Sequence, residues 1–341
     1  YPFGDKWIEP ITPQGYNADL KWETTTTYNV GLDLGFLDNR ITASADFYHR
    51  YTTDLLNWTP VAAGSNLTNY LDANIGEMKN IGVEAEINAV AIQTKDWFWT
   101  TGANVAWNKN TIIKMTSDDE REDYQGVPTG GISGGVDSKV QIHQSGHPMS
   151  SFFVYQQVYD LDGRPMEGVF VDRNDDGVVD SNDKYFFHKP SADVTFGFNT
   201  TLTYKNWTLA ASGHGSIGNY VYNNVASDGE MIADCWTNNF SSNRLNSAAW
   251  SNFMQACYLS DYYIKDASFF KLDNVTLGYT FPNIFKSSKL ERSLGLNVFA
   301  TVQNVATFTK YEGLDPEVYS GIDNNLYPRP RTYVFGLKFN F

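Results

Sequence analysis

An acidic segment from Asp172 to Asp183 carries the clearest ligand pattern of the sequence, D-x-N-x-D-G-x-x-D-x-x-D. Calcium loops of the EF-hand type place oxygen ligands at positions 1, 3, 5, 7, 9 and 12, and a glycine at position 6 allows the sharp turn. Gly177 occupies that sixth position. The ligand positions hold side-chain oxygens and one backbone carbonyl: Asp172, Asn174, Asp176, Val178, Asp180 and Asp183. This spacing predicts a structural Ca²⁺ site.

The last ligand position differs from the usual loop. Asp183 stands where a Glu normally supplies two oxygens to the ion, and its shorter side chain reaches less far. The alternative interpretation is an acidic turn on a solvated loop. The flanking residues lack the pattern of long helices, so we expect a bound Ca²⁺ to brace the loop and not to act as a switch.

Residue types that serve catalysis are not arranged as catalytic motifs. The sequence has no nucleophile elbow, no Ser/His/Asp signature and no paired-carboxylate motif, and its histidines are scattered and are not expected to form a ligand pair. We therefore expect a protein that is not an enzyme. Cys235 and Cys257 leave two possibilities open, one disulfide or two unpaired thiols.

The composition excludes several classes of protein. The chain has 341 residues, of which 25 are basic and 39 acidic, for a net charge of −14. This charge argues against a nucleic-acid partner, because phosphate binding needs a basic patch. The mean hydropathy of −0.39 and the lack of a long apolar run exclude a helical membrane protein. The 9 Trp, 21 Tyr and 22 Phe exclude a disordered acidic chain.

Hydrophobic residues alternate with polar ones in about nine segments. Alternation with period two is the pattern of a β-strand, because successive side chains point to opposite faces. Most of these segments are near ten residues, which is the length that a tilted strand needs to cross a bilayer. Strands of soluble proteins are usually about half as long. The predicted strands are 28–36, 41–48, 81–89, 97–107, 194–204, 207–213, 275–281, 294–302 and 333–341.

Aromatic residues lie at the ends of the apolar faces, and the opposite faces are rich in Gly, Asn, Thr, Asp and Glu. Outer-membrane barrels have aromatic girdles at both interfaces and a polar lumen. The pattern therefore favours an all-β, antiparallel transmembrane β-barrel segment. A secreted, calcium-stabilised β-sandwich that binds glycans is the soluble alternative.

Short and long connections alternate along the chain. The long ones are 49–80, 108–193, 214–274 and 303–332, and tight or shorter links join the other strand pairs. Bacterial barrels have short periplasmic turns and long extracellular loops. We therefore expect extracellular long loops, with 109–191 as a large loop that contains the calcium-type motif.

The odd number of strands has a topological consequence. Single-chain bacterial barrels have an even number of strands, with both termini in the periplasm. Here the parity puts Phe341 at the periplasmic rim and Tyr1 outside the cell. We therefore expect residues 1–341 to be the C-terminal part of one barrel domain in a longer polypeptide, whose remaining strands pair with this segment.

Four segments resemble the SusC/RagA family of TonB-dependent outer-membrane transporters of Bacteroidetes. They are residues 20–33, 46–56, 74–84 and 327–337. The resemblance implies a barrel of about 22 strands whose lumen holds a plug. It also implies a SusD-like surface lipoprotein as partner, TonB as energy source and uptake of oligosaccharides or peptides. The plug and the TonB-contacting segment are absent from these residues, so we expect them further N-terminal. A passive porin is a further alternative.

The aromatic residues fall into two predicted groups. The alternating C-terminal residues resemble the assembly signal of outer-membrane proteins and also face lipid: Tyr333, Phe335, Phe339 and Phe341. Aromatic residues in the long loops are expected to contact the substrate or the lipoprotein. These are Trp58, Tyr70, Trp236, Trp250, Tyr311 and Tyr327, together with Tyr124 and Tyr319.

Overall fold

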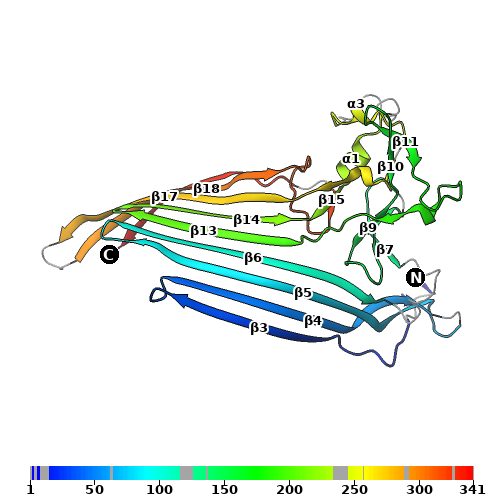
Figure 1. The fold of residues 1–341 in the computed structure, drawn as a ribbon, viewed down its shortest axis with the longest axis horizontal. Helices are drawn as coiled ribbons and strands as arrows, with labels where there is room; N and C mark the ends of the chain where they lie inside the picture. The colour runs from blue at the N-terminus through cyan, green and yellow to red at the C-terminus, as the bar shows by residue number, and fades with distance from the viewer. Residues whose placement is uncertain are drawn as a thin grey trace.

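A long antiparallel sheet dominates the structure (Figure 1). The computed structural model describes residues 2–3, 6–7, 15–61, 64–115, 126–135, 137–232, 245–255, 257–287, 292–324 and 327–340. Within these residues the main sheet has nine strands in the order β20-β18-β17-β14-β13-β6-β5-β4-β3. Their bounds are β3 Thr24–Phe36, β4 Ile41–Pro60, β5 Tyr70–Gln93, β6 Trp97–Lys114, β13 Val194–Tyr204, β14 Trp207–Ile217, β17 Phe269–Ser287, β18 Arg292–Thr309 and β20 Thr332–Asn340.

Each strand of this sheet pairs with the sheet strand that follows it in the sequence, and every pair is antiparallel. The prediction of an all-β antiparallel barrel segment with about nine strands is confirmed. The sheet stays open within the described chain, with β3 and β20 as its two edges.

Several strands are about twice as long as the sequence pattern predicts. β4 has 20 residues and β5 has 24, so most of the segment predicted as loop 49–80 is strand. The reason is that alternation marks only the part of a strand with an apolar face. In the added parts the register shifts between Thr52 and Leu56, and Asp54 has a φ of 58°. A bulge of this kind breaks period two.

The predicted apolar and polar faces are confirmed by the register. Val30 pairs with Phe47, Phe47 with Val83, and Val83 with Trp107, so the apolar residues form rows across the strands. These side chains are exposed, with 73% of Val30 accessible. On the opposite face Asp46 pairs with Glu84. The sheet therefore has one apolar face without a protein cover in the described residues and one polar face.

Glycines on the polar face accommodate aromatic rings from neighbouring strands. The ring of Tyr48 on β4 lies over Gly82 on β5, and the ring of Phe299 on β18 lies over Gly336 on β20. A Cβ atom at either glycine would overlap the ring. These contacts fix the register between neighbouring strands.

Tight turns join strands at one end of the sheet, where β20 also ends (Figure 1). Leu37, Asp38 and Asn39 between β3 and β4 have φ values of 53°, 55° and 62°, and Lys205 in the turn between β13 and β14 has a φ of 52°. The link of about a dozen residues predicted between 281 and 294, which contains Pro282, is shorter than expected, because β17 continues to Ser287, which pairs with Arg292 on β18. A register shift between Phe281 and Phe285 absorbs the proline.

The long connections at the other end pack together as one body, here called the loop domain. It contains a four-stranded sheet, a three-stranded sheet, the β10–β11 hairpin and short helices. Its elements are β7 Val127–Gly131, β8 Lys139–His143, β9 Ser151–Val154, β10 Gln157–Tyr159, β11 Pro165–Phe170, η1 Ser181–Asp183, β12 Tyr185–Phe186, β15 Tyr220–Asn223, α1 Asn224–Gly229, α3 Ala248–Ser251, η2 Asp261–Tyr263, β16 Ile264–Asp266 and β19 Ile322–Asp323.

The loop domain has its own hydrophobic core. Phe152, Tyr222, Phe253 and Tyr263 are buried together although they come from different connections. The predicted loop 109–191 is therefore not a separate unit, and β6 occupies its first residues up to Lys114. A further pair, β1 Pro2–Phe3 and β2 Lys6–Trp7, lies near the N-terminus. None of the helices in the described ranges is long and apolar enough to span a membrane.

Candidate functional site

A cavity of about 950 Å³ lies where the polar face of the sheet meets the loop domain, and its lining combines polar side chains with apolar ones such as Phe196 and Phe269. Strands β5, β6, β13 and β14 form its wall, and residues 317–320 and Arg329, from the connection between β18 and β20, lie beside it. The side chains that matter most for its chemistry are Asn80, Asn104, Asn108, Asn110, His214 and Tyr319.

Side-chain amides line one side of this cavity. Asn104, Asn108 and Asn110 share one face of β6, and Asn80 on β5 lies opposite Asn110. Asn110 donates to Asn80 Oδ1 at 3.0 Å, and Asn108 Oδ1 accepts from the hydroxyl of Tyr48 at 3.2 Å. Each amide offers donors and an acceptor, so this wall can bind groups that both donate and accept.

A cluster of paired charges, here called the charged clamp, joins the sheet to the connection after β18. Lys271 Nζ on β17 lies 2.7 Å from Asp315 Oδ1 and 2.8 Å from Glu317 Oε2. Arg329 contacts the same two carboxylates at 3.2 and 2.8 Å. Only 4% of Lys271 is exposed, so its charge needs these partners.

The clamp also determines the ionisation of Glu317. Partial burial raises the pKa of this carboxyl, but the hydrogen bond and charge of Lys271 lower it, and the charges of Arg329 and His214 add to that effect. The net result is a pKa below the usual range of a Glu. Glu317 is therefore ionised at neutral pH and holds its two cationic partners.

His214 extends the clamp across the sheet. Its Nδ1 lies 2.7 Å from Asp273 Oδ2, and its Nε2 lies 3.7 Å from Glu317 Oε1. Asp273 is the extra residue of a β-bulge, because Ser212 pairs with Asn274 while Gly213 pairs with Leu272. Such bulges redirect a side chain, here toward the cavity wall.

Tyr319 lies in the connection between β18 and β20, two residues after Glu317 of the charged clamp. Its side chain is fully exposed, at 104% of the reference value, although the residue lines the cavity. The residues that follow are held in place: Gln141 Nε2 donates to the carbonyl of Ser320 at 2.9 Å, and Tyr222 N donates to the carbonyl of Gly321 at 2.8 Å. The connection is thus anchored by hydrogen bonds directly after an exposed aromatic residue that lines the cavity.

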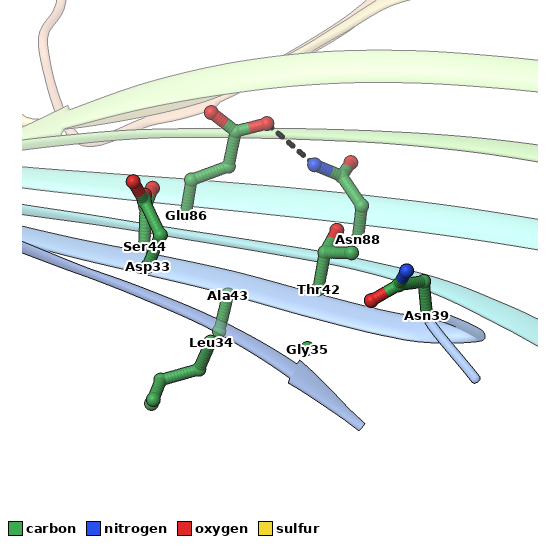
Figure 2. Close-up of a pocket in the computed structure, with 9 residues that line it drawn as sticks. All are labelled: Asp33, Leu34, Gly35, Asn39, Thr42, Ala43, Ser44, Glu86 and Asn88. Atoms are coloured by element: carbon green, nitrogen blue, oxygen red, sulfur yellow. Dashed lines mark hydrogen bonds between the residues drawn. The ribbon is translucent and has the colours of Figure 1, made fainter. Parts of the chain in front are cut away.

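A second, smaller hollow of about 370 Å³ lies on the polar face near the tight turns (Figure 2). Asp33, Ser44 and Glu86 project to the same side of β3, β4 and β5, whereas Leu34 points the other way. Asn88 donates to Glu86 Oε1 at 2.6 Å. This hollow has acidic walls but lacks an aromatic side chain among its lining residues.

The acidic loop forms a series of turns that use its own carboxylates. Asp172 accepts from the backbone N–H groups of Asp175 and Gly177, both at 2.8 Å. Asp183 is completely buried and accepts from the N–H groups of Arg173, Asn174 and Asp180. These hydrogen bonds lower the pKa of Asp183, and the one from the N–H of Asp180 has the largest effect.

The other predicted ligands lie in the same loop. Asn174 Oδ1 accepts from the N–H of Asp176, Asp176 Oδ1 from Val178, and Asp180 Oδ1 from Asn182. Across the described ranges, no three His, Cys, Asp or Glu side chains converge at a point that could hold a metal. The carboxylates are engaged with amides instead, and the Ca²⁺ site stays a prediction.

The predicted aromatic contact residues do not gather in one place. Trp58 and Tyr70 stack at 6.0 Å between β4 and β5, and Trp250 on α3 lies 5.2 Å from the guanidinium carbon of Arg164. Tyr311 is buried and donates to Asp323 Oδ2 at 2.7 Å. It therefore supports the loop and offers no contact surface, contrary to the prediction. Tyr327 is exposed.

Some predicted residues lie outside the described ranges: Tyr124, Cys235, Trp236 and Phe341. Of the C-terminal aromatic residues, Tyr333, Phe335 and Phe339 are exposed on the apolar face of β20. Cys257 is buried.

The cavity and the charged clamp were not predicted from the sequence. The asparagines at 104, 108 and 110 gave a signal for a polar wall, because they alternate on the lumen face of one predicted strand and its continuation. Nothing local indicated the clamp, because Lys271 lies on β17 while its partners Asp315, Glu317 and Arg329 lie in the connection between β18 and β20.

Comparison with known proteins identifies relatives over nearly the whole chain. Residues 4–305 match the family described as TonB dependent receptor-like, beta-barrel. The chain is 45% identical to the TonB-dependent receptor SusC of Bacteroides thetaiotaomicron, over 100% of this chain and 34% of that protein. It is 29% identical to the TonB-dependent receptor P3 of Formosa agariphila, over 99% of this chain and 36% of that protein.

Solved structures show the same fold. The RagAB peptide transporter superposes with a TM-score of 0.74 at 24% identity, over 95% of this chain and 36% of that chain. The RagAB peptide importer in its "open-open" state gives a TM-score of 0.74 at 25% identity, over 95% and 35%. The chain therefore spans about a third of the length of the relatives that it matches.

Proposed function

Because this chain belongs to the TonB-dependent receptor β-barrel family, we propose that it forms part of the wall of an outer-membrane importer of oligosaccharides or peptides. The observation that carries the proposal is the two-faced sheet, with an exposed apolar face on one side and a polar face, which borders the cavity, on the other. An apolar band facing lipid and a polar lumen are what a transmembrane barrel requires.

The open edges of the sheet support a role as one part of a barrel. β3 and β20 have no further strand partner in the described chain, and exposed strand edges cannot persist in hydrocarbon. The remaining barrel strands and the plug would come from the same polypeptide, and TonB would engage its N-terminal part. Outer-membrane lipid would cover the apolar face.

We infer the orientation from the two ends of the sheet. The tight turns and the end of β20 would lie in the periplasm, and the loop domain would lie outside the cell (Figure 1). In this orientation the cavity would lie on the extracellular side, where an incoming substrate arrives first.

A SusD-like lipoprotein would cover the loop domain. The support is an exposed group of apolar side chains on the β10–β11 hairpin and beside α3. Leu161, Met166, Trp250 and Met254 are all exposed there. Aromatic and Met side chains are enriched in protein interfaces, and exposed apolar groups of this kind mark them.

Ca²⁺ is proposed as a structural ion of the loop from Asp172 to Asp183. The donor set consists of hard oxygens at the spacing of calcium loops. The loop already turns at Asp175 and Gly177, which have φ values of 60° and 85°. A bound ion would brace this part of the loop domain by drawing the carboxylates together.

The proposed function is tested with the complete gene in its native bacterium. Deleting the gene is expected to abolish uptake of one class of labelled oligosaccharide or peptide, and an uncoupler of the proton gradient is expected to have the same effect on the wild type. Uptake that survives the uncoupler would identify a passive porin. Recovery of the protein in the soluble fraction would favour the β-sandwich and overturn the proposal.

A further inference from the structure

Tyr319 is among the residues that line the cavity, and its side chain is fully exposed. The two residues that follow it are fixed by hydrogen bonds, one from the side chain of Gln141 and one from the backbone of Tyr222. A ligand in the cavity can therefore reach this ring. An exposed aromatic ring on a well-anchored loop offers a large contact area with little loss of conformational entropy on binding. Both faces of the ring are apolar, and its edge carries a polar hydroxyl group.

The charged clamp holds the backbone of the connection that carries Tyr319. Asp315 and Glu317 precede Tyr319 by a few residues, and both are tied to the buried Lys271 on β17. Glu317 N also donates to Asp315 Oδ1 at 2.9 Å, which closes the turn between the two carboxylates. Lys271 therefore acts on the cavity through the loop and is a positioning residue for Tyr319.

The charges of the clamp are balanced within it. Lys271 and Arg329 are matched by Asp315 and Glu317, and Asp273 Oδ2 lies 2.7 Å from His214 Nδ1. An ionic group of a ligand would therefore have to break an existing ion pair in order to bind here. The cavity thus favours a ligand that carries no charge at this point.

One side of the cavity wall is suited to hydroxyl groups, while Phe196 and Phe269 add apolar surface to the lining. The amides of Asn80, Asn104, Asn108 and Asn110 present donors and acceptors, and a hydroxyl uses both. A sugar ring combines such hydroxyls at its edge with an apolar C–H face that can lie on an aromatic ring. A peptide presents polar backbone groups but also charged termini, for which this wall has no free counter-charge among the described residues.

We propose that Tyr319 is a specificity-determining stacking residue for a neutral oligosaccharide, and that Lys271 positions it through the charged clamp. This inference rests on the proposed function, because it assigns a substrate class to the cavity of the importer. The amide wall would hold the ring hydroxyls while Tyr319 covers one face of a sugar unit.

The test uses the full-length importer, purified with any lipoprotein that copurifies. Binding is measured by calorimetry with short neutral oligosaccharides of glucose, mannose, galactose and xylose, with oligogalacturonate, and with a tryptic peptide digest. One neutral oligosaccharide is expected to bind. Tyr319→Ala is expected to weaken that binding about tenfold or more, and Tyr319→Phe only about threefold or less, because the stacking face is kept.

The matched control is Tyr327→Ala, since Tyr327 is also exposed in the connection after β18 but is not among the residues that line the cavity. It is expected to leave the affinity unchanged. Heat-modifiable migration in gels checks that each variant forms a barrel. If the wild type binds a neutral oligosaccharide and Tyr319→Ala binds it equally well, the inference is overturned while the proposed function stands.

The positioning role of Lys271 is tested by a double-mutant cycle. Lys271→Met is expected to weaken oligosaccharide binding, and the double variant Lys271→Met/Tyr319→Ala is expected to bind no more weakly than Tyr319→Ala alone, because both changes remove the same contact. Additive losses would overturn this role. Binding of peptides or oligogalacturonate instead of neutral sugars would overturn the substrate class. A wild type that neither binds nor imports any probe would refute the proposed function itself.

Discussion

Lys271 on β17 and Asp315 in the connection after β18 form an ion pair of 2.7 Å that is almost closed to solvent. The pair joins a strand that crosses the sheet to a loop that lies over its polar face. Because both partners are buried, neither can be rehydrated if the other is removed. The ion pair therefore fixes the connection between β18 and β20 to the main sheet at this point.

Removing one partner of this pair should loosen the loop. Asp315→Asn leaves the Lys271 charge buried with fewer partners, and breaking a buried pair typically costs about 3–5 kcal/mol. Hydrogen exchange of residues 311–324 in the full-length protein is expected to rise strongly. The matched control is Asp54→Asn, whose partner Lys21 is mostly exposed. That change is expected to cost less than about 1 kcal/mol, and equal effects of both changes would contradict the importance of burial.

Acid should release the same loop. The pKa of Glu317 is lowered in the folded state by Lys271, Arg329 and His214 against the effect of burial. A lowered pKa means that the stabilisation is complete above the unfolded pKa of a Glu and is lost as the pH falls through the lower, folded value. Protease cleavage in residues 311–324 is therefore expected to stay slow at neutral and mildly acidic pH and to increase only below the normal Glu range. Glu317→Gln should flatten this pH profile; an unchanged profile would assign the transition to another group.

Gly82 should tolerate no side chain. A Cβ atom there would overlap the ring of Tyr48 on the neighbouring strand. Gly82→Ala is expected to destabilise the barrel by about 1–3 kcal/mol, because a close-packed contact has to open. The fraction of heat-modifiable, folded protein in outer membranes measures the effect. Gly131→Ala is the control, since a Cβ atom at that glycine would meet open space within 4 Å. If both variants fold equally well, the ring–glycine contact is not needed for assembly.

The sequence predicted those parts of the fold in which lipid contact dictates the pattern. Rows such as Val30, Phe47 and Val83 alternate because one face of the sheet meets hydrocarbon and the other meets water. Period two disappears in the halves of β4 and β5 nearest the loop domain, where the register shifts, so the sequence pattern alone marks them as loops. The packing of the loop domain was not predictable either, because Phe152 comes from the connection between β6 and β13, whereas Tyr222 and Phe253 come from that between β14 and β17.

The candidate site was predicted only in its general chemistry. A polar lumen face followed from the Asn, Thr and Gly residues, and Tyr319 was among the loop aromatics. The charged clamp depends on contacts between Lys271, Asp315 and Arg329, which lie far apart in sequence. Charge pairing over such distances leaves no local pattern, so only the fold brings these residues together.

Calcium should protect the loop from Asp172 to Asp183. We expect terbium luminescence or calorimetry on the full-length protein to show one site, with a Kd of about 10⁻⁴–10⁻³ M as in extracellular calcium modules. Saturating Ca²⁺ at about 100 times Kd would stabilise the bound form by about 2.7 kcal/mol, so chelation should speed proteolysis of this loop. Asp176→Ala is expected to abolish binding, because its carboxylate is a predicted ligand. Asp162→Ala, in the preceding exposed turn, is the control and should bind normally. Two results would contradict the prediction: equal metal binding by both variants, or a rate of proteolysis that chelation does not change. Either would show that the carboxylates only accept hydrogen bonds from the backbone N–H groups of the loop.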